Sequence, residues 1–176
     1  EYEPEQAITT PVQKTVYGLD AEFVMMGWRV PGANDYLRSE VGDIVGDILY
    51  NGQAGLADLN LIQAQKVNGF YGFNYTRPDY GEFMLVGYPR EGQTLDEVRD
   101  LMLEQVAKLR SGDFDESLIQ STLNNYKLSN MRQLEDNSRR AMNFVQSFIN
   151  GHDWKDDALQ MQRLEKITKQ QIVDWA

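Results

Sequence analysis

Two alternating segments joined by a turn constrain the fold more than any other part of this sequence. Residues 66–77 alternate between two sets of side chains, and residues 80–88 alternate again after Pro78-Asp79. Proline fixes φ and aspartate can bond nearby backbone, so the chain is expected to reverse direction there. Alternation with a period of two is typical of strands. The pair therefore predicts an antiparallel hairpin with about ten residues in each arm.

The first arm of this hairpin mixes glycine with aromatic residues. One face is predicted to carry Val67, Gly69, Tyr71, Phe73 and Tyr75, and the other Phe70, Gly72, Asn74 and Thr76. Glycine weakens a strand unless another group approaches closely. One interpretation is a binding strand on which Tyr71 presents its hydroxyl to a ligand. The other is that the aromatic residues pack beneath helices and the glycines relieve crowding, and strand propensity favours this second interpretation.

A further strand and a helix precede the hairpin. Residues 21–30 predict an inner strand with Val24, Met26, Trp28 and Val30 on one face, and residues 13–18 predict a weaker strand before it. Asn34 or Asp35 can then cap a helix. Apolar residues at a spacing of three and four define one face of this helix: Leu37, Val41, Ile44, Val45, Ile48 and Leu49. Residues 56–65 predict a shorter helix.

The second half of the chain is predicted to be helical. Thr94-x-x-Glu97 and Thr168-x-x-Gln171 are capping boxes, which start helices by reciprocal hydrogen bonds. Between them we expect helices over residues 95–111, 115–134 and 154–167. Another helix is expected from Asp136 or Asn137 to Gly151, and its inward-facing residues are predicted to be Met142, Val145, Phe148 and Ile149.

This order of elements predicts an α+β fold. Antiparallel strand pairs with helices between them favour a two-layer sandwich, in which helices cover an antiparallel sheet and a helical extension follows. Residues 1–11 contain two prolines and predict a linker, and residues 12–176 predict a single domain. The chain begins at Glu1 and stops within a predicted helix, so we expect it to be a piece of a longer protein.

Composition excludes several functions. The 27 acidic residues outnumber the 17 basic residues and give a formal net charge of −10, which disfavours nucleic acid and anionic membrane surfaces as partners. No apolar run approaches the ~20 residues of a membrane span. The absence of cysteine excludes disulfides and thiolate chemistry. With one histidine, a zinc site with two histidines and a Ser-His-Asp triad are both disfavoured.

The acidic clusters have simpler explanations than catalysis or metal binding. His152 lies near Asp153, Asp156 and Asp157, which could form a weak metal site or a solvated connection whose acids suit a helix N-terminus. Catalytic zinc needs three protein ligands, which favours the second reading. The clusters around Asp115 and Asp136 stand where helices should begin, and capping accounts for them.

Many pieces of the sequence, taken in order, resemble one protein family. They are the run Val24–Pro31, the stretch Ile48–Leu56, the strand Gly69-Phe70-Tyr71-Gly72, the Thr94 helix and the Gly112-x-x-Asp115 entry to a long helix. The chain from Val12 onward resembles the non-zinc part of a repeat unit in the pitrilysin/insulinase group of zinc metallopeptidases. These are the inverted zincins, whose motif is H-x-x-E-H.

The resemblance implies a non-catalytic role for this chain. Such peptidases consist of similar α+β units paired into halves that close around a peptide or unfolded polypeptide, and only one unit carries zinc. This sequence has no H-x-x-E-H, so no catalytic or metal-binding residue is expected in it, and zinc is expected in another domain or in a partner subunit. Two alternatives stay open: a catalytically inactive scaffold or assembly subunit, and a peptide-binding module that accepts an added strand at a sheet edge.

The resemblance also implies substrate-binding residues. Tyr71 matches a tyrosine that, together with an arginine, helps to hold substrate in far-half units. The stretch Leu61–Lys66 has no arginine, and Gln63 or Gln65 stands in its place. A neutral amide lacks the positive charge with which an arginine strengthens its hydrogen bonds to a peptide carbonyl or carboxylate. We expect Tyr71, Gln63 and Gly72 to contact substrate. Bacterial members are often exported, which favours the cell envelope or periplasm.

Overall fold

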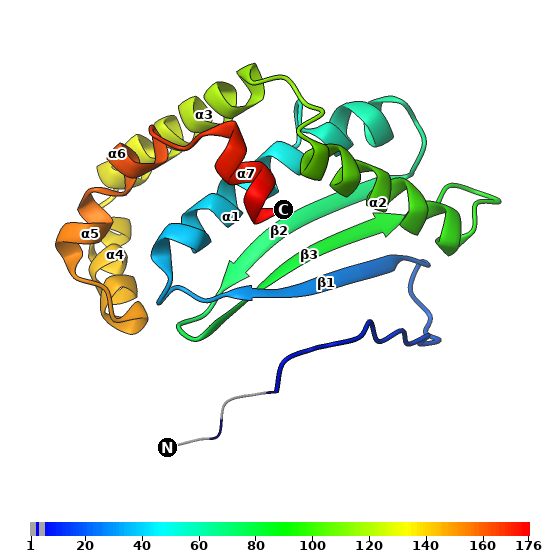
Figure 1. The fold of residues 1–176 in the computed structure, drawn as a ribbon, viewed down its shortest axis with the longest axis horizontal. Helices are drawn as coiled ribbons and strands as arrows, with labels where there is room; N and C mark the ends of the chain where they lie inside the picture. The colour runs from blue at the N-terminus through cyan, green and yellow to red at the C-terminus, as the bar shows by residue number, and fades with distance from the viewer. Residues whose placement is uncertain (1–2, 4–5) are drawn as a thin grey trace.

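A three-stranded antiparallel sheet with helices over one face forms the described part of the chain (Figure 1). The structure is a computed structural model and describes residue 3 and residues 6–176. Its elements are β1 (Val24–Pro31), α1 (Tyr36–Leu49), the π-helix η1 (Asp58–Gln63), β2 (Gly69–Thr76), β3 (Tyr80–Tyr88), α2 (Leu95–Ser111), α3 (Ser117–Glu135), α4 (Asn137–Asn150), α5 (Trp154–Ala158), α6 (Gln160–Leu164) and α7 (Lys169–Trp175). The predicted α+β class is confirmed.

The hairpin of β2 and β3 provides the centre of the sheet. β3 lies between β1 and β2 and pairs antiparallel with both, so that Gly87 stands opposite Val24 on one side and Phe70 on the other. A Cβ atom at Gly87 would lie 2.6 Å from both Met102 Sδ and Val98 Cγ1. Glycine at this position therefore lets α2 pack directly on the central strand.

Helix α1 packs along β2 on the same face of the sheet. Asp35 caps it by accepting a hydrogen bond from the Arg38 backbone N–H. Its fully buried residues are Ile44, Val45, Ile48 and Leu49, whereas Leu37, which the helical spacing placed inward, is 54% exposed. Leu37 lies in the first turn of α1, whereas the buried residues of this helix begin at Glu40. Its side chain therefore lies outside the part of α1 that packs on the sheet.

The capping boxes and the glycine ends of the helices are confirmed. The Thr94 and Thr168 side chains each accept from the backbone N–H three residues on, and Glu97 and Gln171 return the bond. Gly112 and Gly151 end α2 and α4 in the left-handed region, at φ values of 71° and 70°. These local motifs depend on adjacent residues only, which is why the sequence identifies them well.

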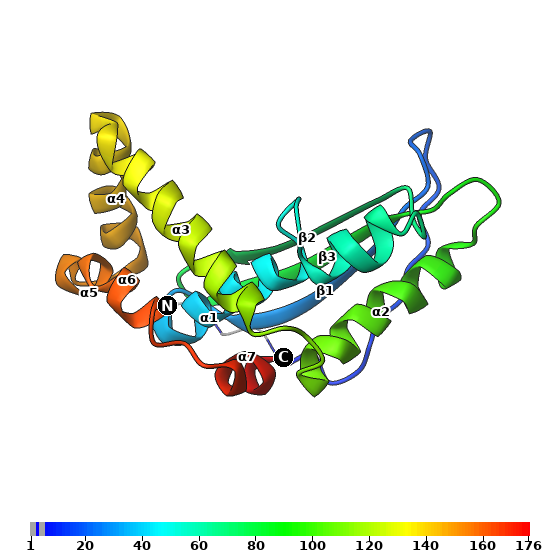
Figure 2. The same cartoon turned by 90° about the horizontal axis from the view of Figure 1, so that it is seen from above.

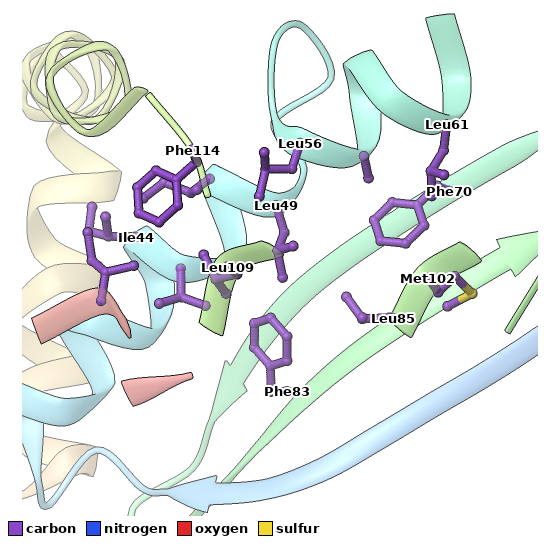
Figure 3. Packing of buried hydrophobic residues seen from close by; sticks show 14 of the residues in the cluster. Ile44, Leu49, Leu56, Leu61, Phe70, Phe83, Leu85, Met102, Leu109 and Phe114 are labelled. Carbon is purple, nitrogen blue, oxygen red and sulfur yellow. The ribbon is translucent and has the colours of Figure 1, made fainter. Parts of the chain in front are cut away.

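The core lies between the sheet and α1, α2 and α7 (Figure 3). Phe70 and Leu85 point from the sheet toward Leu49, Leu61 and Met102. The last helix closes this layer, because the Trp175 ring lies 5.3 Å from the Phe83 ring and its indole N–H donates to the Arg38 carbonyl. Gly42 permits this contact, since a Cβ there would lie 2.8 Å from the Trp175 ring.

Two predicted elements are wrong. Residues 13–18 form no strand, and Val16 and Tyr17 are 87% and 93% exposed, because no strand in the described chain pairs with this segment. Residues 154–167 divide into α5 and α6 at Leu159, whose backbone is at the edge of the helical region. The apolar spacing did not signal this break.

The predicted burial of α4 is also wrong. Its apolar residues Met142, Val145, Phe148 and Ile149 are 58%, 45%, 85% and 52% exposed. α4 packs on α3 and α5, and Figure 2 shows that α3 and α4 extend away from the sheet. Amphipathic spacing shows which residues share a face of a helix, but it does not show what covers that face.

Because one residue is buried and the other is exposed, we expect two truncations of apolar side chains to differ strongly in their effect on the free energy of unfolding. Leu85→Ala, which opens a cavity beside a fully buried strand residue, is expected to lower the free energy of unfolding by about 2–5 kcal/mol. Phe148→Ala on α4 serves as the exposed control and is expected to change it by less than about 0.5 kcal/mol. Urea unfolding followed by circular dichroism measures both. Equal losses would show that the α4 face is buried in the isolated chain.

Candidate functional site

The outer face of the sheet, which no helix of the described chain covers, is the candidate site. The pairing places Tyr71, Phe73 and Tyr75 of β2 on this face, opposite Val86, Met84 and Glu82 of β3. Met25 of β1 stands beside Val86. Tyr71 and Tyr75 are each 50% exposed. The two sets of alternating residues in β2 were predicted correctly, but the packing of Tyr71, Phe73 and Tyr75 beneath helices was wrong.

Tyr71 lies in a row of aromatic rings. Its ring centroid is 5.7 Å from that of Tyr50 and 6.0 Å from that of Tyr88, both edge to face. Phe23 extends the row, with its ring 5.7 Å from Tyr88. Edge-to-face rings stabilise one another, so the Tyr71 ring is held in place while half of its surface stays open. We name Met25, Tyr71, Phe73, Tyr75 and Tyr88 the outer aromatic face.

Tyr50 is a member of this site that the sequence did not identify. It follows the last residue of α1 and contacts Phe70 on the inner face as well as Tyr71 on the outer face. Burial is the main cause that raises the pKa of the Tyr50 hydroxyl, and the nearby Asp58 and Tyr71 raise this pKa further. This hydroxyl is therefore a neutral hydrogen-bond donor at physiological pH. Its contacts join residues 21 positions apart, and no local pattern signals them.

Gln63 forms a hydrogen bond to the loop that precedes η1. Its side-chain amide donates to the Gln53 carbonyl at 2.9 Å. The buried Asp58 carboxylate accepts from the backbone N–H groups of Asn51 and Gly55, both at 3.0 Å, and so fixes the same loop. Since η1 packs on β2, Gln63 helps to position the loop next to the strand that carries Tyr71.

Gly72 faces the core rather than the outer face. A Cβ atom there would lie 3.0 Å from Leu85 Cδ2 and 3.5 Å from the Phe70 ring. Glycine therefore relieves crowding at this position, as one of the two interpretations of the sequence proposed. The structure does not bring Gly72 to the same face as Tyr71, although both belong to one strand.

The acidic clusters serve as helix caps and local pairs. Asp115 accepts from the Ser117 backbone N–H at 2.7 Å, and Asp136 accepts from Ser138 and Arg139. These backbone hydrogen bonds lower the pKa of both carboxyl groups. Each nitrogen of His152 faces an oxygen atom, one of Asp157 and one of Ala33. In the described residues, no three histidine, aspartate or glutamate side chains come together as a metal site would require.

A polar cleft of about 540 Å³ lies on the helical side, between α1, α3, α4 and α5. Asp43 of α1 lines it and accepts a hydrogen bond from the Asn74 side-chain amide at 2.9 Å. Burial raises the Asp43 pKa to about 6, the Asn74 bond opposes this rise, and Asp47 and Glu40 add to it. The pKa of Tyr126 is raised to about 12, mainly by burial and then by the charges of Asp43, Asp47 and Glu40.

The helices in the described part of the chain are all too short or too polar to cross a membrane.

Comparison with protein families gives one match. The family described as the peptidase M16 inactive domain matches residues 2–126, which is more than half of the chain. A search of curated proteins found no match.

Several solved structures share the fold. A protease from Helicobacter pylori superposes with a TM-score of 0.80 at 16% identity, over 87% of this chain and 36% of that one. The inactive peptidase domain of a candidate zinc protease from Bordetella parapertussis has a TM-score of 0.73 at 17% identity, over 87% and 82%. A candidate zinc protease from Bordetella pertussis Tohama I has a TM-score of 0.74 at 17% identity, over 90% and 87%. The chain thus spans about a third of the Helicobacter protease.

Removing the buried charge of Asp43 should stabilise the protein at neutral pH. The native pKa of about 6 exceeds the ordinary 3.8, so the native state holds this proton more tightly than the unfolded state. Stability is therefore expected to fall by about 1–3 kcal/mol as pH rises from about 4 to about 6. Asp43→Asn abolishes the part of this decrease that Asp43 causes and keeps an acceptor oxygen for the Asn74 side-chain amide.

Chemical unfolding at pH 4.5, 6 and 7.5 tests this expectation. At pH 7.5 the Asp43→Asn variant should be more stable than the wild type by about 1–3 kcal/mol. Glu104→Gln, an exposed charge removal on α2, is the matched control and should leave the slope unchanged. An identical dependence on pH in Asp43→Asn and the wild type would contradict the assignment.

Proposed function

Because the chain belongs to the family of M16 peptidase inactive domains, we propose that it forms part of the wall of a substrate chamber in a zinc-dependent metallopeptidase. The observation that carries this proposal is the outer aromatic face, an uncovered sheet surface with half-exposed rings. In this proposal another part of the peptidase cleaves the peptide bond, and this chain provides a surface that contacts the bound polypeptide.

The chemistry of the chain supports a role without metal. A catalytic zinc ion needs three protein ligands and an open position. The described residues bring no such set of donors together, and the only histidine is engaged at both nitrogens. In this proposal zinc is held by another domain of the same protein or by a partner subunit, and that part is also the immediate partner of this domain.

Tyr71 is the residue that we propose touches the substrate. Its ring is fixed by Tyr50 and Tyr88, and its half-exposed surface can contact an apolar side chain while its hydroxyl hydrogen-bonds to a peptide group. Gln63 supports the adjacent loop through Gln53, and Gly72 keeps β2 close to the core. In this account these two residues position the binding strand, and Tyr71 makes the contact.

The free edge of β1 favours a second mode of binding. Among the described strands, β1 pairs with β3 alone and no strand occupies its other edge, as is also true of β2. Strand addition uses main-chain hydrogen bonds, whereas the outer aromatic face uses side chains. The two modes differ in which amide groups a bound peptide protects, and protection confined to β1 would favour strand addition.

We expect the isolated chain neither to hold zinc tightly nor to cleave peptides. Equilibrium dialysis against Zn²⁺, followed by metal analysis after passage over a weak chelating resin, should leave far less than one ion per chain. A fluorogenic unfolded peptide should stay intact with or without a chelator. One retained ion per chain together with chelator-sensitive hydrolysis would contradict the proposal.

Truncation of Tyr71 should weaken peptide binding. Tyr71→Ala removes the exposed ring and is expected to raise the Kd for a labelled unfolded peptide roughly 5- to 10-fold, which corresponds to about 1 kcal/mol. Tyr71→Phe separates the ring from the hydroxyl, and its Kd should lie between those of the wild type and the alanine variant. Fluorescence polarisation measures all three constants.

Phe148→Ala is the matched control for Tyr71→Ala, because it removes an exposed aromatic ring from α4 rather than from the sheet. Its Kd should equal that of the wild type. Loss of affinity in Phe148→Ala, with Tyr71→Ala unaffected, would place the peptide site on the helices and refute the outer aromatic face.

A further inference from the structure

The helices α4 and α5 form an arm beside the cleft. α4 packs on α3 and α5, and the arm lies at the end of the molecule away from the sheet (Figure 2). The cleft of about 540 Å³ separates the arm from the first turns of α1. Besides the packing of α4 on α3, polar groups connect the arm to the body across the cleft.

His152 makes one of these links. It stands between α4 and α5, and its Nε2 lies 2.6 Å from the carbonyl oxygen of Ala33, the buried residue that precedes α1 by three positions. Its Nδ1 lies 2.9 Å from Oδ1 of Asp157 in α5. The imidazole therefore connects the arm to the body of the domain across 119 residues of sequence.

Both oxygen atoms that face this ring are acceptors. A carbonyl oxygen can only accept, and an ionised carboxylate can only accept. The other oxygen of Asp157 is already engaged as acceptor by the Ser147 hydroxyl. Both hydrogen bonds exist together only when both ring nitrogens carry protons, which is the imidazolium form. A neutral ring has one N–H and can keep only one of the two bonds.

The bond to Ala33 is the one that a neutral ring should lose. A hydrogen bond to a carboxylate is charge-assisted and stronger than one to a carbonyl, so the remaining proton favours Nδ1 and Asp157. The bare Nε2 then faces the Ala33 carbonyl, and two lone pairs at 2.6 Å repel each other. The bond that fails is therefore the one that His152 makes between the arm and the body.

The other charged groups around the ring include a second link between the arm and α1, which runs through Arg163 and does not involve His152. On α1, the Tyr36 ring packs edge-on at 5.7 Å from the imidazole, and Glu40 is paired with Arg163 of α6. Arg163 also lies over the Tyr36 ring at 4.7 Å. From α5, Asp157 contacts the ring directly, and Asp156 binds Arg163 through its carbonyl. Asp153 caps α5 next to the histidine.

Two further titratable groups line the cleft, Asp43 of α1 and Tyr126 of α3. Asp43 is bonded to Asn74 rather than to the arm. A change in its charge therefore acts on the junction of α1 with β2, and its effect can be removed separately by substitution.

We propose that His152 is a pH-sensitive latch, which holds the α4–α5 arm against the start of α1 when the ring is doubly protonated and releases it when the ring loses a proton to solvent. The arm is thus closed when the ring is an imidazolium and looser when the ring is neutral. Release widens the cleft and frees the exposed face of α4 to change its position.

Nitrogen-15 NMR of the unmodified chain tests the latch directly, because the single histidine gives one imidazole signal set. At pH 5.5 we expect both ring nitrogens to carry slowly exchanging protons. At pH 8.5 we expect a neutral ring with its proton on Nδ1. A neutral ring with its proton on Nε2 would retain the bond to Ala33 and would overturn the proposal.

Amide hydrogen exchange of the arm provides the second test. After correction for intrinsic rates, the protection of residues 137–158 in the wild type should fall several-fold between pH 5.5 and pH 8.5. His152→Ala, which leaves no donor for the Ala33 carbonyl, should show the low value at both pH values, and Lys155→Gln, an exposed change on α5, should behave like the wild type. Equal protection in His152→Ala and the wild type at pH 5.5 would refute the latch.

The variant Asp43→Asn separates the latch from the buried carboxyl group. It should keep the wild-type decrease in arm protection, because it leaves His152, Ala33 and Asp157 in place. Loss of the decrease in Asp43→Asn would assign the pH dependence to Asp43 and would refute the proposal for His152.

Discussion

The structure depends on one packing arrangement, in which the helices that cover the three-stranded sheet all lie on the same face of it. β3 runs through the centre, and Gly87 lets Met102 and Val98 of α2 approach its backbone closely. α1 packs beside it through four fully buried aliphatic residues. Burial of apolar surface on this face supplies the main driving force for folding. The opposite face contributes little to that core and keeps its aromatic rings exposed.

This asymmetry links the fold to its proposed role. A sheet face that is not needed for the core can carry Tyr71, Phe73 and Tyr75 for contact with another molecule. The rings of Tyr50 and Tyr88 hold Tyr71 in place, so the site is preorganised by packing and not by a flexible loop. In the proposed role this surface contacts a polypeptide and performs no chemistry, as is expected of an inactive peptidase domain.

The features that sequence reasoning predicted well depend on neighbouring residues. Period-two alternation predicts the second hairpin arm. Short-range hydrogen bonds determine the Asp35 cap, the two capping boxes and the glycine ends of α2 and α4. The division of β2 into two faces was also correct. The sequence could not show which face the helices cover, because Phe70 and Tyr71 are both aromatic and only distant partners distinguish them.

The errors have the same origin. Phe148 has perfect helical spacing, but α4 extends away from the sheet and nothing in the described chain covers it. Residues 13–18 have strand propensity without a partner strand. Tyr50 joins the site across β2, and His152 reaches Ala33 across the cleft, through contacts between distant positions. Such contacts are set by the assembly of elements and not by local composition.

Mapping a bound peptide on the domain by NMR tests the central claim most directly. Addition of an unfolded peptide, without zinc, should shift the ring signals of Tyr71, Phe73 and Tyr75 and the methyl signal of Met25, and should leave those of Phe148 and Met142 unchanged. Shifts confined to α4, or no shifts on the sheet at saturating peptide, would contradict the account of this domain as a peptide-contacting wall.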